Sequence, residues 1–143
     1  MNLGIIGSRD FINYKHGEKC LDALSLEKGW TISQIVSGKA KGADTIGADW
    51  GRAKGITVVE YEPDWSLGRG AGMARNTTII ECSDVVVAFW DMISKGTKDS
   101  ITKAKKAGKE VIIVDVSEVI AKDKSELKKQ AERREYLVNL AKK

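Results

Sequence analysis

Five short, nearly continuous apolar runs constrain the fold of this 143-residue chain more than any other feature. They lie at residues 3–6, 32–36, 56–61, 84–90 and 110–116. Runs that are apolar without alternation are typical of strands buried on both faces of a parallel sheet. Segments with one apolar side separate the runs and are typical of helices, at 14–28, 43–54, 71–82, 97–107 and 117–141. The alternation predicts a three-layer α/β fold with helices on both faces of a five-stranded parallel sheet.

The length and composition are those of one globular domain. We expect it to span residues 1–143, with its core at 2–116 and an amphipathic helical tail at 117–143. No apolar run approaches the roughly 18 residues that a membrane span needs, and no basic segment precedes the first run as in a signal peptide. We therefore expect a cytoplasmic protein with no membrane partner.

Few side chains suit metal or histidine chemistry. Cys20 and Cys82 lack the spacing of metal ligands, and His16 is the only histidine. The glycine fingerprint of NAD-binding domains does not follow the first apolar run. These observations disfavour a zinc site, a histidine-based triad and a routine NAD dehydrogenase, so we expect no metal and no resident cofactor.

The basic charge of the chain lies mostly in its tail. The net charge is +4, and residues 118–143 hold eight basic and five acidic side chains. A mildly basic amphipathic tail is usually a solvated helix face, so we disfavour nucleic acid as a partner. The amphipathic tail could pack on a second copy of the chain or on its own sheet. The first alternative would give a homodimer or a higher homo-oligomer.

The loops after the strands should hold the ligand, because open parallel sheets bind ligands outside the carboxyl ends of their strands. The first loop offers a sharp turn, a hydroxyl and a guanidinium that suit an anion, at Gly7, Ser8, Arg9 and Asp10. The second loop combines glycines, lysines and a helix start into an anion cradle, with candidates Ser37, Gly38, Gly42, Ala43 and Asp44. Asp44 suits a helix cap and an acceptor for ribose hydroxyls equally well.

The third loop is long for a compact domain, and long loops are often functional. Its candidates are Asp64 and Trp65, followed on the next helix by Arg75 and Asn76. Trp65 suits stacking on a base or packing in the core. If Arg75 faces inward it must meet an anion or a polar ligand, because burying an unpaired charge is costly.

The fourth loop opens a helix with Ser94, Gly96 and Thr97, shortly after Asp91. Backbone amides and two hydroxyls at the positive end of a helix favour phosphate. These residues complete the predicted site, a pocket for a nucleotide-like, phosphate-bearing small molecule.

Over residues 2–116 the chain resembles the YspA-like (cpYpsA-related) branch of the SLOG superfamily, through the motifs G-S-R-D-F, V-S-G-x-A-x-G-A-D, P-D-W…A-G-x-x-R-N and A-F-W-D…S-x-G-T. That superfamily also includes the LOG phosphoribohydrolases and the DprA DNA-binding proteins. The resemblance implies a Rossmann-like fold with strand order 3-2-1-4-5 and binding of nucleotides or their derivatives.

Within the resemblance, the segment 94–97 is similar to the phosphate-binding P-G-G-x-G-T of LOG enzymes, and 73–76 is similar to their M-x-x-R-K. LOG enzymes carry a glutamate three residues after the threonine, where this chain has Ser100. The neighbouring Asp99 would point about 100° away on a helix. This departure favours binding over hydrolysis.

Three functions stay open at this point. The first is a sensor or binding module for nucleotide derivatives. The second is an N-glycosidic hydrolase, which needs a carboxylate to activate water; its candidates are Asp10, Asp44, Asp91 and Asp99, and no pattern selects one. The third is single-stranded nucleic-acid binding through Lys39, Lys41 and the tail, which the near-neutral charge of the remaining chain disfavours.

Overall fold

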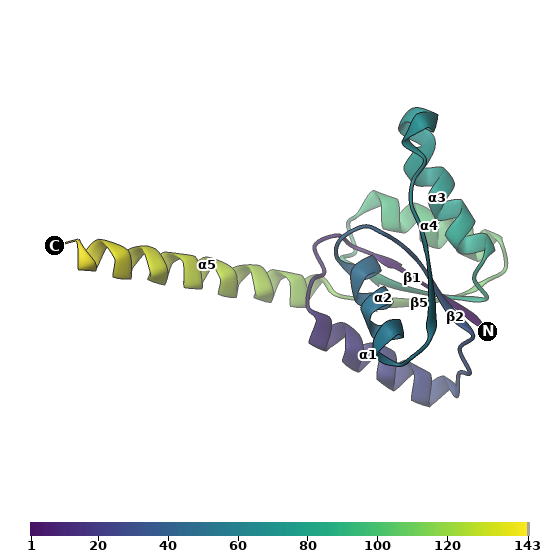
Figure 1. Cartoon of the computed structure of the whole chain (residues 1–143), viewed down its shortest axis with the longest axis horizontal. Helices are drawn as coiled ribbons and strands as arrows, with labels where there is room; N and C mark the ends of the chain where they lie inside the picture. The colour runs from purple at the N-terminus through teal and green to yellow at the C-terminus, as the bar shows by residue number, and fades with distance from the viewer. Residues whose placement is uncertain (143) are drawn as a thin grey trace.

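A five-stranded, all-parallel sheet forms the centre of the protein, as seen in a computed structural model that describes residues 1–142 (Figure 1). The strands are β1 (Asn2–Gly7), β2 (Gln34–Gly38), β3 (Thr57–Tyr61), β4 (Val85–Trp90) and β5 (Glu110–Asp115). They are ordered β3-β2-β1-β4-β5, and every neighbouring pair is parallel. The predicted α/β class and strand order are therefore confirmed.

Helices cover both faces of this sheet, as the alternating pattern predicts. They are α1 (Tyr14–Lys28), α2 (Ala43–Ala53), α3 (Ala71–Glu81), α4 (Lys95–Lys106) and α5 (Ser117–Ala141). A short 3₁₀ segment, η1 (Trp65–Gly70), precedes α3 where the sequence predicts only a long loop. Helix α5 is continuous from Ser117 to Ala141, in agreement with the helical pattern at 117–141.

Two separate hydrophobic cores hold the layers together. On one face, α1, α2 and the start of α5 pack on the sheet around residues such as Leu21, Trp50 and Ile120. On the other face, α3 and α4 pack through Ile79 and Ile101. Figure 1 shows these two helix layers on opposite sides of the strands. The central strands β1, β2 and β4 are therefore buried, and all three end at the same edge.

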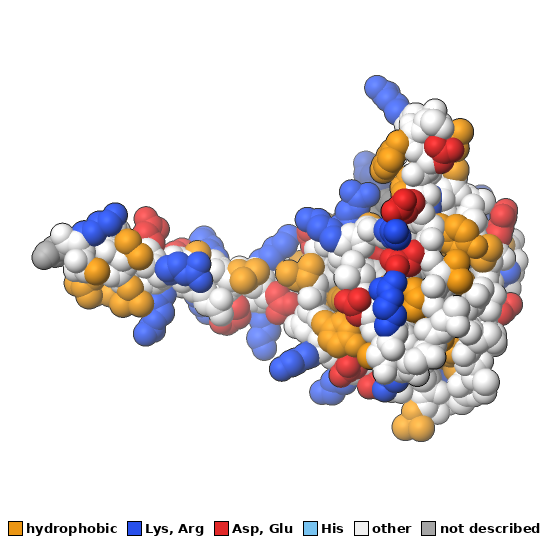
Figure 2. Space-filling view, in the orientation of Figure 1, with side chains coloured by type: hydrophobic (Ala, Val, Ile, Leu, Met, Phe, Trp, Pro, Cys, Tyr) orange, Lys and Arg blue, Asp and Glu red, His pale blue; other side chains and the backbone are white. Residues whose placement is uncertain are grey.

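Helix α5 leaves this body and projects away from it (Figure 1). Ile120 is 8% exposed and anchors the first turns, and Lys124 Nζ lies 3.0 Å from Asp10 Oδ2 on the body. Residues 124–142 are all exposed. Figure 2 shows basic side chains along the projection and apolar ones toward its end, where Leu137, Val138 and Leu140 are about half exposed.

No helix within residues 1–142 combines the length and the apolar character that crossing a bilayer requires.

Candidate ligand-binding site

A cavity of about 350 Å³ lies at the edge where the central strands end. The structure brings ten of the predicted ligand-binding residues to its wall: Gly7, Ser8, Arg9, Asp10, Asp44, Arg75, Asn76, Ser94, Gly96 and Thr97. Ile6, Ala40 and Ser100 also line it. The cavity is therefore built from the first, second and fourth predicted loops, with a further wall supplied by Arg75 and Asn76 of α3.

The loop after β1 is tied to the neighbouring strand. The Ser8 amide donates to the Phe89 carbonyl at 2.9 Å, and the buried Ser8 hydroxyl donates to Asp91 at 3.3 Å. The same hydroxyl oxygen accepts from the Asp10 amide at 3.2 Å. Arg9 is exposed on the rim, while Asp10 is held by Lys124. Ser8 thus serves to shape the loop, whereas the Arg9 guanidinium forms no ion pair within residues 1–142.

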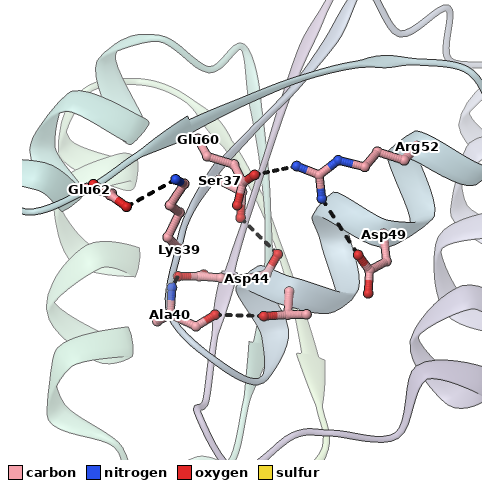
Figure 3. Close-up of polar contacts among 9 residues, drawn as sticks. Ser37, Lys39, Ala40, Asp44, Asp49, Arg52, Glu60 and Glu62 are labelled. Atoms are coloured by element: carbon pink, nitrogen blue, oxygen red, sulfur yellow. Dashed lines mark hydrogen bonds and ion pairs between the residues drawn. The ribbon is translucent and has the colours of Figure 1, made fainter.

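The connection between β2 and α2 is organised by Asp44 (Figure 3). The Asp44 carboxylate accepts from the Ala40 amide at 3.3 Å, and its carbonyl accepts from the Ser37 hydroxyl at 3.1 Å. The Ala43 amide donates to the Ser8 carbonyl at 3.1 Å. The predicted anion cradle at residues 38–44 is therefore corrected, because two of its amides already have partners within the protein.

Asp44 is a buried carboxylate, only 8% exposed. Burial raises the pKa of Asp44 from its ordinary 3.8 to about 6, although Arg75, the Ala40 amide and Arg9 oppose the rise. The side chain lines the cavity and does not cap α2, whose N-cap is Gly42. Of the two predicted roles, the structure thus leaves Asp44 as an acceptor that faces the cavity.

Gly38 lets a cation and a carboxylate approach each other behind the cavity. A Cβ placed on Gly38 would lie 2.4 Å from Arg75 Nη1 and 2.6 Å from Asp44 Oδ2. Arg75 reaches this place from α3, held by Nε donating to Asn76 Oδ1 at 2.8 Å and Nη1 to the Tyr61 carbonyl at 3.4 Å. Arg75 forms no direct ion pair within residues 1–142, although its charge favours the ionised form of the nearby Asp44 carboxylate.

Gly42 allows a second close approach, between the start of α2 and the loop that follows β1. Its φ is 86°, and a Cβ there would lie 2.5 Å from the Ser8 carbonyl oxygen. Ser37, Gly38, Gly42 and Ala43 are buried behind the cavity and do not line it. These four predicted ligand residues therefore shape the wall and do not form its surface.

The connection between β4 and α4 is organised by Asp91. Its carboxylate accepts from the Ser94 amide at 2.7 Å, the Ser94 hydroxyl at 2.6 Å and the Ile93 amide at 3.0 Å. Burial alone would raise the pKa of Asp91, but these bonds and the one from Ser8 hold it below its ordinary value. The Asp91 carboxylate accepts hydrogen bonds from within the protein and does not line the cavity. The prediction of Asp91 as a ligand residue is therefore corrected.

The first turn of α4 borders the cavity, and no side chain within residues 1–142 accepts a capping hydrogen bond from its backbone amides. Ser94 is the N-cap, yet its hydroxyl donates to Asp91 and caps no amide of α4. Gly96 and the buried Thr97 line the cavity at this turn. The positive end of the helix therefore points at the space that Arg75 also borders.

Models of two protein families match this sequence. The SLOG cluster4 family model matches residues 36–141, and the model of the YspA, cpYpsA-related SLOG family matches residues 3–68. The chain belongs to the SLOG superfamily. No curated protein matches this SLOG chain.

A solved structure shares the fold. It comes from a study of the single-stranded DNA binding mode of DNA processing protein A from Helicobacter pylori. The match has a TM-score of 0.57 at 24% identity and covers 79% of this SLOG chain. It covers 64% of the solved chain, so the SLOG chain spans less than two thirds of that protein's length.

This comparison contradicts the expectation that disfavoured nucleic acid as a partner. A protein of the same fold binds single-stranded DNA, so the near-neutral charge outside the tail was not a ground for exclusion. Net charge averages over a whole chain, whereas binding responds to local charge. In this SLOG chain Arg9, Lys39 and Lys41 gather along one rim of the site.

The remaining predicted residues lie outside the cavity. Asp64 caps η1 by accepting from the Ser66 amide at 3.1 Å. Asp99 pairs with Lys103 at 3.1 Å, and Trp65 borders a neighbouring cavity. Of the four catalytic candidates, Asp10 and Asp44 line the cavity, whereas Asp91 and Asp99 do not.

Ser100 was missed as a lining residue. It is 3% exposed and follows Thr97 by one helical turn, so the helical period was the signal that could have found it. Within residues 1–142, no group of three or more His, Cys, Asp or Glu side chains is placed to hold a metal ion.

Proposed function

We propose that this SLOG protein binds a nucleotide-derived, phosphate-bearing small molecule in the cavity at the strand ends, as a sensor or binding module. The observation that carries the proposal is the meeting of an unpaired guanidinium, Arg75, with the open first turn of α4 around one cavity. Both features attract an oxyanion, and together they suit a phosphate.

Asp44 supplies the second half of the recognition. Its carboxylate lies on the Arg75 side of the same cavity and is mostly ionised above pH 6. An ionised carboxylate accepts hydrogen bonds from hydroxyl groups, such as those of a ribose. The volume of about 350 Å³ falls within the roughly 300–1,000 Å³ of small-molecule sites. A sugar phosphate is therefore the smallest ligand that uses both halves.

The experiment is a thermal-shift screen with ribose 5-phosphate, AMP, NAD and ADP-ribose. We expect at least one of them to raise the melting temperature, and Arg75→Ala to abolish the rise. Arg69→Ala is the matched control, because Arg69 is an exposed arginine just before α3 that lines no part of the cavity. A shift that survives Arg75→Ala would contradict the proposal.

A second candidate function is cleavage of the N-glycosidic bond of such a ligand. The observation that favours it is the pKa of about 6 at Asp44, which leaves both protonation states populated near neutral pH. Water would add to the anomeric carbon, the C–N bond would break, and the base would leave with a proton. Release of free base and ribose phosphate from AMP, lost in Asp44→Asn, would establish it.

A third candidate is binding of single-stranded DNA, favoured by the fold shared with DNA processing protein A. Lys39 and Lys41 would contact the strand's phosphates at the rim. Such binding weakens steeply with salt, because each neutralised phosphate releases counterions. Retention of a labelled oligonucleotide at low salt, reduced in Lys41→Ala, would support it.

A further inference from the structure

A second cavity of about 500 Å³ adjoins the first. The two share three wall residues, Arg9, Ala40 and Arg75. Because the same residues border both spaces, the two cavities are adjacent, and we consider a ligand that reaches from one into the other. The ligand must then be larger than a sugar phosphate.

Trp65 forms the outer wall of this second cavity. Its side chain is 71% exposed, whereas Trp50 in the core is 2% exposed. The alternative in which Trp65 fills the core is therefore wrong. An exposed indole that borders a cavity offers a flat π face on which an unpaired base can stack.

The wall of the second cavity also carries four cationic side chains, Arg9, Lys39, Lys41 and Arg75, and one carboxylate, Glu62. Lys39 is paired with Glu62 at 3.0 Å (Figure 3), but neither Lys41 nor Arg9 has a carboxylate partner within residues 1–142. These two charges lie at the same cavity as Trp65 and raise the local concentration of anionic ligands. The second cavity thus combines a stacking surface with attraction for a negatively charged molecule.

We propose that the second cavity receives the base of a nucleotide, stacked on Trp65, while the phosphate of the same nucleotide lies in the first cavity against Arg75 and α4. This inference rests on the proposed function. The shared chemistry is an unpaired base joined to a phosphate, and a free mononucleotide or the end of a single strand can supply it. Stacking accepts any base, so the cavity discriminates little between purines and pyrimidines of equal size.

The test compares AMP, ribose 5-phosphate and adenosine by titration of tryptophan fluorescence and by thermal shift. AMP should bind roughly 5- to 100-fold more tightly than ribose 5-phosphate, the effect expected for one stacked base. Trp65→Ala should remove that difference and leave the affinity for ribose 5-phosphate unchanged. Trp65→Phe should keep most of it, because an aromatic face remains.

Leu67→Ala is the matched control, because Leu67 is 62% exposed on the same segment and lines neither cavity. It should leave both affinities unchanged. A 5′-phosphorylated oligonucleotide distinguishes the two sources: tighter binding than AMP, lost in Trp65→Ala, assigns the site to a strand end, and the reverse order assigns it to a free nucleotide.

Equal affinities for AMP and ribose 5-phosphate, unaffected by Trp65→Ala, would overturn the stacking proposal and leave the proposed function standing. Failure of every phosphate-bearing ligand to bind would overturn the proposed function and this inference with it.

Discussion

Two strand-to-helix connections meet at the same edge of the sheet, yet they place their aspartates differently. Between β2 and α2, the carboxylate of Asp44 lies inside the helix and accepts from the Ala40 amide of its own loop. Between β4 and α4, the carboxylate of Asp91 lies before the helix and accepts from Ile93 and Ser94. Asp44 therefore lines the cavity itself, whereas the β4–α4 side is lined by Ser94, Gly96 and Thr97 and not by Asp91.

The two sides of the cavity therefore present different chemical groups to a ligand. The β2–α2 side presents a buried carboxylate, which suits hydroxyl donors, and the β4–α4 side presents amides, which suit an anion. Arg75 lies beside the carboxylate at Gly38 and borders the same space. A ligand with hydroxyls at one end and a phosphate at the other fits this polarity in one direction only.

Asp44→Asn tests the β2–α2 side and should have the largest effect. The folded pKa of about 6 lies above the ordinary 3.8, so ionising Asp44 destabilises the folded state as pH rises between these values. Removing the charge should raise the free energy of unfolding at pH 7 by up to about 3 kcal/mol. The gain should shrink toward pH 4 and vanish as the pH falls well below 3.8, where Asp44 is protonated in both states.

Urea unfolding of wild type and Asp44→Asn at pH 4 and pH 7 measures this effect. The variant should gain stability and lose affinity for hydroxyl-bearing ligands together. If Asp44→Asn is less stable than wild type at pH 7, the carboxylate is not a strained, ligand-facing group and the comparison fails.

Asp91→Ala tests the β4–α4 side and should act in the opposite direction. It removes the acceptor of four hydrogen bonds, donated by Ser8, Ile93 and twice by Ser94. We expect a loss of about 2 kcal/mol in the free energy of unfolding. Asp99→Ala is the control and should change stability by less than about 0.5 kcal/mol, because its pair with Lys103 lies on the helix surface.

Gly96→Asp should sharpen the comparison with a smaller effect, confined to binding. Space is open around a Cβ at Gly96, so the substitution fits without strain. It places a carboxylate at the helix start that we assign to phosphate, and we expect about a tenfold loss of phosphate affinity. Gly96→Ala should bind as wild type does, and calorimetric titration with ribose 5-phosphate distinguishes the two variants.

Much of this architecture was readable from sequence, for reasons that differ between elements. The apolar runs predicted all five strands, because a strand buried on both faces has no polar face. Helix α1 begins at Tyr14 and ends at Lys28 as predicted, since Asn13 caps it and Gly29 stops it in the left-handed region.

The site was predictable as a set of loops but not as a set of contacts. Strand order brings the loops together, so ten candidate residues reach one cavity. The direction of each carboxylate depends on neighbours far apart in sequence, and Asp91 therefore looked like a ligand residue although it holds Ser8 and Ser94. The exposure of Trp65 was equally hidden, because its apolar character suits a core as well as a ligand.

The projection of α5 has a consequence for spectroscopy. All four tryptophans, Trp30, Trp50, Trp65 and Trp90, precede this helix, so indole emission reports only on the body. Circular dichroism of the backbone reports on both, and a solitary helix with little packing frays at lower temperature than a packed one. The two probes should give non-coincident melting curves on one sample, with the ellipticity falling first; coincident curves would mean that the helix is held by something beyond its own first turns.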